Sequence, residues 1–451
     1  MRLVMAVLTV SSAFLIWAGI LLVEGIAPLH KTAEKVPDSY IVKLKDNCDV
    51  DVVAQQLEDH VIMRRSGGRL THRYRRSIRG FGAYLPTKEA VNLVLNHEAV
   101  EYVQENGIVR VTSLDEAQLT SSSASRETSS NIPWNLDRID QAELPLDGRY
   151  NPANDGNDVT VYVLDTGILP THAEFGQRAS ACFDALGGTG IDCTGHGTYV
   201  AGIVAGETYG VASKVRVCGV RVVGASCDTE GTVADVVAGI DWVGHHASKP
   251  AVVTLSLNMY GEHIPLGHAL DGLIELTGVT VVVAAGNMDD DACNCSPSGN
   301  EQVITVGATN VEDTRWPSSN WGPCVDIFAP GVEVKSATRT GPHDTMILSG
   351  TSVACPHVAG AAAIILAEDP SLTHASVKAK ILAAGTPDVL LFNQGNTTET
   401  IEATDNLLMR VQTEGAPSEV KENFEEKTEL NIEKPIPKIV FQNVDRSQIE
   451  P

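Results

Sequence analysis

Four polar residues, far apart in the sequence, carry the side chains that an acyl-transfer reaction needs. They are Asp165, His196, Asn287 and Ser352, in that order. A serine nucleophile needs a neutral imidazole to accept its proton, and the imidazole needs a carboxylate on its other nitrogen. A nearby amide can donate to the oxyanion. Taken singly, each residue has an ordinary explanation as a turn residue, a metal ligand or a helix cap. Together they predict nucleophilic catalysis by a serine.

Each of these residues lies at one end of an apolar or helical run. The runs are 159–164 before Asp165, 197–206 after His196, 279–285 before Asn287 and 357–367 after Ser352. The stretch 349–360, Ser-Gly-Thr-Ser-Val-Ala-Cys-Pro-His-Val-Ala-Gly, is expected to place Ser352 in a loop just before a buried helix. The N-terminus of a helix favours developing negative charge, so this position suits a nucleophile.

Strand-like and helical runs alternate from residue 132 to 412. Further runs cover 215–223, 233–245, 251–257, 267–276 and 303–308. Uniformly apolar strands such as Val-Thr-Val-Val-Val-Ala-Ala at 279–285 are typical of a parallel sheet covered on both faces. In such sheets an active site forms at the carboxyl ends of the strands. The sequence therefore predicts an α/β fold that brings the four residues together.

The motifs around these residues resemble those of the subtilisin superfamily of serine proteases, and most closely its proteinase K branch. They are Asp165-Thr-Gly, Gly195-His-Gly-Thr, Ala285-Gly-Asn, Gly350-Thr-Ser and Asn131-Ile-Pro-Trp-Asn-Leu-Asp-Arg-Ile139. The resemblance covers residues 37–412. It implies a subtilisin-like parallel sheet with helices on both faces, preceded by a small α+β, ferredoxin-like prodomain. It also implies that Asp165 orients His196, that His196 is general base and then acid for the nucleophile Ser352, and that Asn287 donates to the oxyanion.

The first 27 residues are expected to be a signal peptide, or alternatively a signal anchor, because Arg2 precedes a long apolar run. Residues 38–113 are expected to form the inhibitory prodomain, with strands at 39–45, 80–84, 100–103 and 108–111 and helices at 50–57 and 88–95. This unit carries a basic block: Arg64, Arg65, Arg69, His72, Arg73, Arg75, Arg76 and Arg79. The block is either a solvated loop or a surface that complements the acidic remainder of the chain.

Residues 114–131 are expected to be a linker with the maturation site near Ser113–Leu114, or alternatively before Asn131. The resemblance implies that the strand ending in Val109-Arg-Val-Thr-Ser-Leu114 occupies the substrate groove until self-cleavage. Arg73-Tyr-Arg-Arg76 resembles a site for furin-like convertases. Residues 413–451, rich in Glu and Lys, are expected to be a disordered acidic tail.

The resemblance also indicates which residues hold a substrate as an added strand. They are Gly231, Ser256, Leu257, Asn258, Ala285 and Gly286. Relatives usually have consecutive glycines where this chain has Asn258-Met-Tyr260, so the primary specificity pocket is expected to be reshaped. Tyr199 and Cys355 also depart from the family pattern, which usually has His and Thr there.

Nine cysteines in an exported chain are disulfide candidates, and an odd number leaves at least one unpaired within the chain. The resemblance implies the bridges Cys193–Cys227 and Cys293–Cys324. No pairing is derived for Cys48, Cys182, Cys218, Cys295 or Cys355, and Cys218 and Cys355 are expected to be buried small hydrophobic residues. No pair of cysteines or histidines has zinc-ligand spacing.

No cofactor is expected for catalysis, and Asp326 is either a ligand of a structural calcium ion or an ordinary carboxylate at the end of a strand. The resemblance implies the Asp326 carboxylate as a ligand, with the carbonyl oxygens of Glu301 and Val303 as possible co-ligands. Two glycosylation sequons begin at Asn294 and Asn396, and Asn396 is the expected acceptor because it lies in a plausible surface loop.

The net charge of −24 argues against nucleic-acid binding, and no membrane span is expected after signal removal. The sequence thus predicts a secreted serine endopeptidase, extracellular or in the secretory lumen, made as a self-inhibited zymogen that acts on proteins or peptides. One alternative is a catalytically silent protein that keeps its prodomain and acts as a binding module. A serine esterase is a further alternative, but the nucleophile does not lie in a Gly-x-Ser-x-Gly elbow. Activity is expected to fall as His196 becomes protonated.

Overall fold

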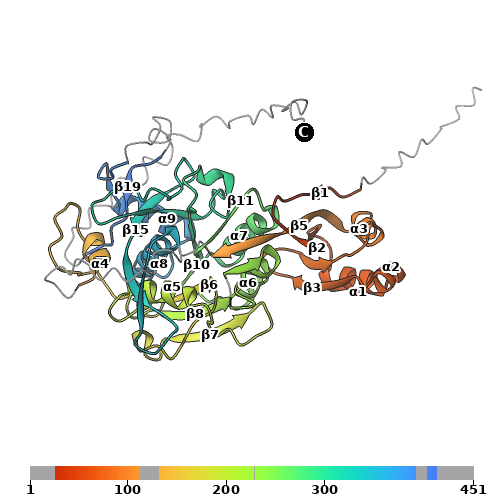
Figure 1. Cartoon of the computed structure of the whole chain (residues 1–451), viewed down its shortest axis with the longest axis horizontal. Coiled ribbons are helices and arrows are strands. Elements are labelled where there is room, and N and C mark those ends of the chain that lie inside the picture. The colour runs from red at the N-terminus through yellow and green to blue at the C-terminus, as the bar shows by residue number, and fades with distance from the viewer. Residues whose placement is uncertain (1–25, 112–131, 228, 393–403, 414–451) are drawn as a thin grey trace, which may run out of the picture.

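The computed structural model describes residues 26–111, 132–227, 229–392 and 404–413. The predicted signal peptide, the maturation site near Ser113–Leu114 and the acidic tail lie outside these residues. The described chain forms an N-terminal unit, residues 26–111, and a main unit, residues 132–413. Figure 1 shows the N-terminal unit in red and orange at one end of the long axis of the molecule.

The N-terminal unit is an antiparallel sheet packed against helices, and β5 is its longest strand. Its elements are β1 Leu29–His30, β2 Lys35–Leu44, α1 Val50–Asp59, α2 Val61–Ser66, β3 Arg69–Tyr74, β4 Gly80–Tyr84, α3 Lys88–Leu95 and β5 Val100–Val111. The sheet order β5-β2-β4-β3 covers a core of its own. The two short strands expected at 100–103 and 108–111 are one continuous strand, because β5 pairs with β2 along its first part and with the main unit along its last part.

The main unit contains a nine-stranded sheet in the order β18-β19-β15-β14-β12-β10-β6-β8-β7. Neighbouring strands from β15 to β7 run parallel. The strands are β6 Thr160–Asp165, β7 Ala179–Asp184, β8 Arg216–Arg221, β10 Ala251–Leu255, β12 Thr280–Ala284, β14 Ile304–Thr309, β15 Ile327–Pro330, β18 Thr386–Pro387 and β19 Leu407–Leu408. The prediction of a parallel sheet is confirmed.

Helices cover both faces of this sheet because its strands are apolar on both sides. Val161 and Val163 of β6 belong to one hydrophobic cluster, with α5 His196–Ala205 and α8 Thr351–Glu368. The alternate residues Tyr162 and Leu164 belong to a second cluster, with α6 Val233–His246 and α7 Ile264–Thr277. A period-two alternation of side chains across a strand produces this division. Helix α9 His374–Ala384 packs against α8.

The remaining elements lie at the edges of the main unit. They are α4 Trp134–Ile139, β9 Glu230–Thr232, β11 Leu257–Tyr260, β13 Cys295–Ser296, β16 Val334–Ala337, β17 Thr345–Leu348 and the 3₁₀ turns Ala173–Phe175 and Ala292–Asn294. Among the described helices only α8 is long and apolar enough to cross a membrane, and 89% of its apolar window is buried inside the protein. It is the core helix of this fold.

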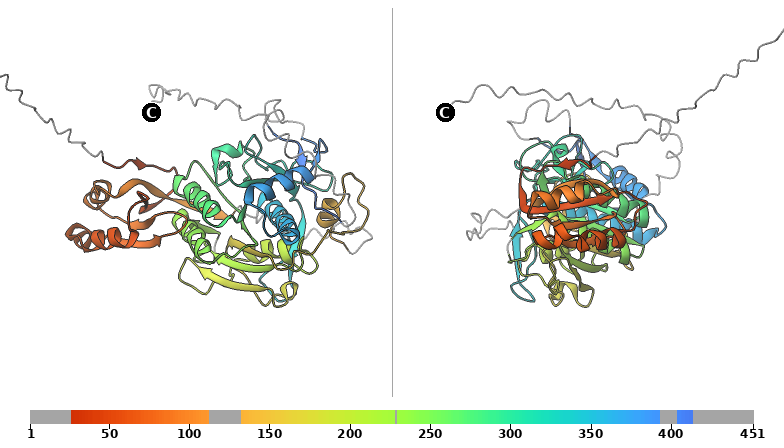
Figure 2. Two further views of the ribbon diagram at one scale, coloured as in Figure 1. Left: turned by 180° about the vertical axis from the view of Figure 1, so that it is seen from behind. Right: turned by 90° about the vertical axis from the view of Figure 1, so that its right-hand side faces the viewer.

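The N-terminal unit docks on the main unit through α6 and α7, the two green helices beside it in the left-hand view of Figure 2. The Asp241 carboxylate of α6 accepts hydrogen bonds from the backbone N–H groups of Arg75, Arg76 and Ser77, at 3.0, 2.7 and 2.9 Å. The N-terminal unit also approaches α7 closely at Gly272. A Cβ there would lie 1.9 Å from the carbonyl oxygen of Ser77, so a larger residue would prevent this contact.

The basic block only partly faces the acidic main unit. The guanidinium groups of Arg73 and Arg75 bind Asp51 of α1, at 3.0 and 2.6 Å. His72 lies across the interface, with its Nε2 atom 3.3 Å from the Asp235 carboxylate. Within the basic block, His72, the Arg76 side chain and the backbone amides of residues 75–77 contact the main unit. The guanidinium groups of Arg73 and Arg75 bind within the N-terminal unit instead.

Candidate active site

The Asp165 carboxylate and the His196 imidazole form a buried pair. Asp165 is the last residue of β6 and His196 is the first of α5. The Nδ1 atom of His196 lies 2.8 and 2.9 Å from the two carboxylate oxygens, so Nδ1–H donates to the carboxylate. The Nε2 atom of His196 has no hydrogen-bond partner among the described residues. This arrangement leaves Nε2 available as a proton acceptor.

A second carboxylate, Asp192, joins the strand that carries Asp165 to the helix that begins at His196. Its Oδ1 accepts from the Thr166 hydroxyl at 2.9 Å and from the Gly195 N–H at 2.7 Å. Its Oδ2 accepts from the Thr198 N–H and hydroxyl at 2.9 and 2.6 Å. The sequence motifs alone gave no role to Asp192. The structure assigns it the positioning of the helix start.

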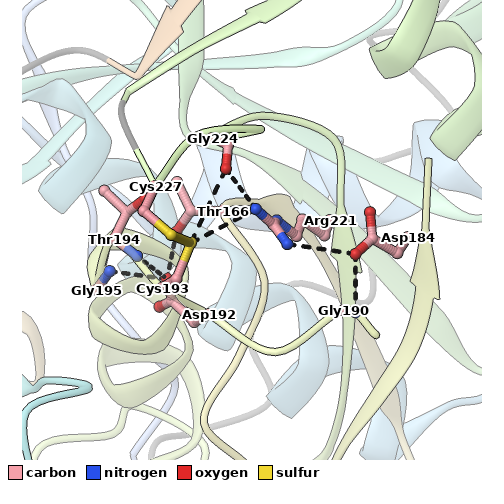
Figure 3. The surroundings of a disulfide bond; sticks show 10 residues. All are labelled: Thr166, Asp184, Gly190, Asp192, Cys193, Thr194, Gly195, Arg221, Gly224 and Cys227. Atoms are coloured by element: carbon pink, nitrogen blue, oxygen red, sulfur yellow. Dashed lines mark hydrogen bonds and ion pairs between the residues drawn. A yellow bond between two sulfur atoms is a disulfide. The ribbon is translucent and has the colours of Figure 1, made fainter. Parts of the chain in front are cut away.

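The disulfide Cys193–Cys227 fixes the loop before His196 to the loop after β8, as Figure 3 shows. The guanidinium of Arg221 lies beside it. Arg221 contacts the Cys193 sulfur at 3.5 Å, donates to the Gly224 carbonyl and pairs with Asp184 at 3.4 Å. The loop before His196 is therefore held by the disulfide and by contacts with the charged Arg221 side chain.

Ser352 lies in the first turn of α8, not in a loop before the helix as expected. The helix begins at Thr351 and contains Pro356. Proline has no N–H, so it cannot donate to the carbonyl four residues earlier, which belongs to Ser352. The hydroxyl of Ser256 donates to that carbonyl instead, at 2.9 Å. This hydrogen bond links the predicted substrate segment 256–258 to the candidate nucleophile Ser352.

His357 connects the start of α8 to Asn135 of α4 through two hydrogen bonds. Its Nδ1–H donates to the Val353 carbonyl at 2.9 Å, and its Nε2 accepts from the Asn135 side-chain amide at 2.9 Å. Burial lowers the pKa of His357 to about 4. This contact links the motif 131–139 to the helix that carries Ser352.

Asn287 is oriented so that its amide nitrogen is free. Its Oδ1 accepts from the Thr351 N–H and hydroxyl, at 2.9 and 2.7 Å. Its Nδ2 is buried without a partner among the described residues. A Cβ on Gly350 would lie 3.1 Å from the Ser352 Oγ and 3.2 Å from the Asn287 Nδ2, so a side chain there would crowd both atoms. The free N–H group and the serine thus border the same small space.

The last part of β5 lies as an added strand between two edges of the main unit. Val109 is opposite Gly231 of β9, and Leu257 of β11 is opposite Val111, both in antiparallel register. Of the predicted substrate residues, Gly231, Leu257 and Asn258 therefore pair with the N-terminal unit. Main-chain pairing of this kind is how extended peptides are held at a sheet edge.

Comparison with known proteins decides the family. Residues 156–402 match the subtilase family, and residues 39–112 match the peptidase inhibitor I9 family. This chain belongs to the subtilase family of serine proteases. It is a serine endopeptidase by family, with the inhibitor match on the N-terminal unit.

Named relatives agree with this assignment. An extracellular serine proteinase from a Thermus species is 40% identical over 79% of this chain and 87% of its own. A cuticle-degrading serine protease from Arthrobotrys oligospora is 34% identical over 80% and 91%. Alkaline serine exoprotease A from Vibrio alginolyticus is 43% identical over 68% of this chain, which spans 55% of that relative. The crystal structure of a cold-adapted subtilisin-like serine proteinase is 42% identical, with a TM-score of 0.59, and covers 63% of this chain and 100% of its own.

The residues expected to bind calcium in this subtilase converge on a lysine. The Lys378 ammonium of α9 lies 2.9 Å from the Asp326 carboxylate, 2.7 Å from the Val303 carbonyl and 3.3 Å from the Glu301 carbonyl. Calcium needs six to eight oxygen ligands, and an ammonium at this point excludes it. These residues therefore do not fit a calcium ion. Elsewhere in the described ranges no group of three or more His, Cys, Asp or Glu side chains could hold a metal ion.

The subtilase contains three disulfides within its described residues, two of which the resemblance implied. Besides Cys193–Cys227 and Cys293–Cys324 it has Cys182–Cys218, which joins the neighbouring strands β7 and β8. The expectation that Cys218 is a free buried thiol is wrong, because parallel pairing brings the two cysteines opposite each other with Cα atoms 5.6 Å apart.

The remaining cysteines are unpaired, and both departures from the family pattern are buried. Cys48, Cys295 and Cys355 are free. Cys355 is fully buried, which raises the pKa of its thiol to about 12, and its sulfur lies 3.3 Å from the Thr254 hydroxyl. Tyr199 is buried, and its hydroxyl donates to the Val334 carbonyl at 2.6 Å. The predicted glycosylation residue Asn396 lies outside the described residues.

Proposed function

We propose that this subtilase is a secreted serine endopeptidase, made as a zymogen that cuts itself and stays inhibited by its prodomain. The observations that carry the proposal are the buried His196–Asp165 pair, the Asn287 amide N–H that has no partner among the described residues and lies beside Ser352, and the pairing of β5 with β9 and β11. Secretion is supported by the basic and apolar start of the sequence and by the extracellular relatives.

In the proposed reaction the Ser352 hydroxyl oxygen attacks the carbonyl carbon of the scissile bond while His196 Nε2 takes its proton. Asp165 stabilises the imidazolium that forms, and Asn287 Nδ2–H donates to the tetrahedral oxyanion. His196 then protonates the leaving amine, and an acyl-enzyme remains. Water attacks this ester with His196 again as base, which releases the new carboxyl group and restores Ser352.

The register of β5 supports a position for the proposed self-cleavage. Leu257 is opposite Val111, so Ser256 is the next residue along the groove toward the nucleophile, and the next residue of the peptide is Thr112. The hydroxyl of Ser256 is bonded to the carbonyl of Ser352. We therefore place the first cut between residues 112 and 113, close to the position that the sequence indicated.

A fluorophosphonate probe tests the proposal on secreted material, with Ser352→Ala as the control. We expect labelling of the wild-type chain once the prodomain has left, no labelling of the variant, and a new N-terminus at residue 113. A wild-type protein that is never labelled, and that keeps its prodomain after one cut, would instead be the silent binding protein.

A further inference from the structure

Asn258 fills the gap between the two segments that flank Ser352. Its Nδ2 donates to the carbonyl oxygens of Ala284 and Ala285, at 3.3 and 3.2 Å, and to the Ser298 hydroxyl at 3.0 Å. A Cβ on Gly286 would lie 2.9 Å from the Asn258 Oδ1. The side chain thus crosses from β11 to the end of β12 and packs against the Gly286 backbone.

This gap is where the side chain next to a scissile bond must go. On one side, the Ser256 hydroxyl donates a hydrogen bond to the Ser352 carbonyl oxygen. On the other, the Gly286 N–H donates to the Thr351 hydroxyl at 3.1 Å, and Asn287 accepts from the Thr351 N–H. A substrate residue whose carbonyl faces Ser352 therefore lies over the gap between segments 256–258 and 285–287.

Asn258 also leaves an acceptor in this gap. Its residue is 5% exposed, and its Oδ1 has no hydrogen-bond partner among the described residues. A buried acceptor without a donor carries a desolvation penalty that a bound donor can relieve. A small side chain with a hydroxyl group would supply that donor.

We propose that Asn258 is a specificity-determining residue that restricts the acyl-side residue of the substrate to small side chains, with Ser and Thr preferred and large aromatic or aliphatic side chains excluded. The inference rests on the proposed proteolytic function. Thr112, the residue that follows Val111, belongs to the preferred class.

Matched peptides that differ only at the acyl-side residue, Thr, Ala, Leu or Phe, test the proposal on the processed enzyme. We expect wild type to cleave after Thr and Ala far faster than after Leu and Phe. Asn258→Gly removes the side chain that fills the gap, so kcat/KM for Phe relative to Ala should rise about 10- to 200-fold. Asn300→Gly, on a loop beside α7, is the control and should leave the ratio unchanged.

Two results would overturn the proposal: a wild-type preference for Phe or Leu over Thr and Ala, or an unchanged ratio in Asn258→Gly. The wild-type profile decides the question even if that variant fails to fold. Fluorophosphonate labelling of the same samples distinguishes a failure of the Asn258 proposal from a failure of the proposed proteolytic function. If the enzyme is labelled but prefers Phe or Leu, only the role of Asn258 is contradicted. If the enzyme is not labelled, the proposed function is contradicted as well.

A separate observation concerns Lys378. An ammonium group has three N–H donors, and here three oxygens receive them. The same helix is held to the same loop by His374, whose Nε2 lies within hydrogen-bond distance of the Gln302 carbonyl oxygen. We infer that the Lys378 ammonium neutralises the charge of these oxygens and links them, as a bound metal ion would, so that no calcium is needed there.

Thermal unfolding in calcium and in EDTA tests this inference. For wild type we expect the same Tm in both. Lys378→Met leaves the oxygens facing one another without a positive charge, so its Tm should fall in EDTA and rise again with calcium, whereas Lys380→Met on the same helix should show no calcium response. A wild-type Tm that depends on calcium as strongly as that of Lys378→Met would overturn the inference, and so would a Lys378→Met variant that does not respond to calcium.

Discussion

The Asn287 side chain is held by its oxygen, while its nitrogen has no partner among the described residues, and this asymmetry supports its proposed role as oxyanion donor. Because Thr351 satisfies Oδ1 twice, the amide cannot turn without losing both hydrogen bonds. The N–H group is therefore fixed before substrate arrives, which is the condition for an oxyanion donor to act without reorganisation.

Removing this donor should reduce the rate of the chemical step. We expect Asn287→Ala to lower kcat about 100- to 1000-fold, the loss known for the oxyanion asparagine of subtilisin, with a small change in KM. Steady-state kinetics on a peptide amide measures this, and Asn157→Ala on an exposed loop is the control. A kcat within threefold (about 0.6 kcal/mol) of wild type would exclude Asn287 from the oxyanion site.

His357 predicts how stability depends on pH. Its folded pKa of about 4 lies below the unfolded value of about 6.5, so the unfolded chain binds the proton more readily. The contribution to stability is present above about pH 6.5 and is lost as pH falls toward 4, by about 3 kcal/mol.

Urea unfolding of the inactive Ser352→Ala protein at pH 7 and pH 5 checks this. We expect the free energy of unfolding to fall between these pH values, and to fall less in the additional variant His357→Gln. The exposed His343→Gln serves as the control. Equal pH dependence with and without His357 would show that this residue is not the titrating group.

At the scale of elements, the site depends on where two helices begin. Helix α5 starts at His196 because Asp192 collects the N–H and hydroxyl groups around it, and because Gly197 permits close approach: a Cβ there would lie 2.1 Å from the Gly167 carbonyl oxygen. Helix α8 starts one residue before Ser352, and Pro356 frees the carbonyl that Ser256 binds.

The disulfides offer a matched test of this arrangement. Replacing Cys193 and Cys227 by serine should lower the free energy of unfolding by about 4 kcal/mol, from the loop entropy of a 34-residue separation, and should also lower kcat because the loop before His196 loosens. Replacing Cys182 and Cys218, which are 36 residues apart, should cost similar stability with less effect on kcat. Chemical denaturation and kinetics report the two effects separately, and equal losses of kcat would contradict the local role.

At the scale of the whole molecule, the proposed inhibition draws on two of the contacts that the N-terminal unit makes with the main unit. One is β5 in the substrate groove, and the other is the Asp241 carboxylate of α6, which accepts from three successive backbone N–H groups. The second contact lies away from the groove, so it can be weakened without touching the catalytic residues.

Asp241→Ala should release the prodomain faster after self-cleavage. Charge-assisted hydrogen bonds contribute about 1.5–3 kcal/mol each, so losing them should raise the prodomain dissociation rate by at least about 30-fold. The time course of activity after processing measures this rate. Asp271→Ala on α7 is the control, and the kcat of the fully mature enzyme should match wild type. An unchanged lag would show that β5 alone holds the prodomain.

The sequence by itself determined the fold class and the residues of the candidate site. Strands that are apolar on both sides require helices on both faces, and residues such as Asp165 and Asn287 follow such strands at a shared edge. The tertiary structure decided what depends on contacts between distant segments. Lys378, 52 residues after Asp326, occupies the expected calcium position. Cys182 pairs with Cys218 because β7 lies beside β8, and Asn258 reaches across to β12. Local spacing does not encode these partners, since each pair meets only after the sheet has assembled.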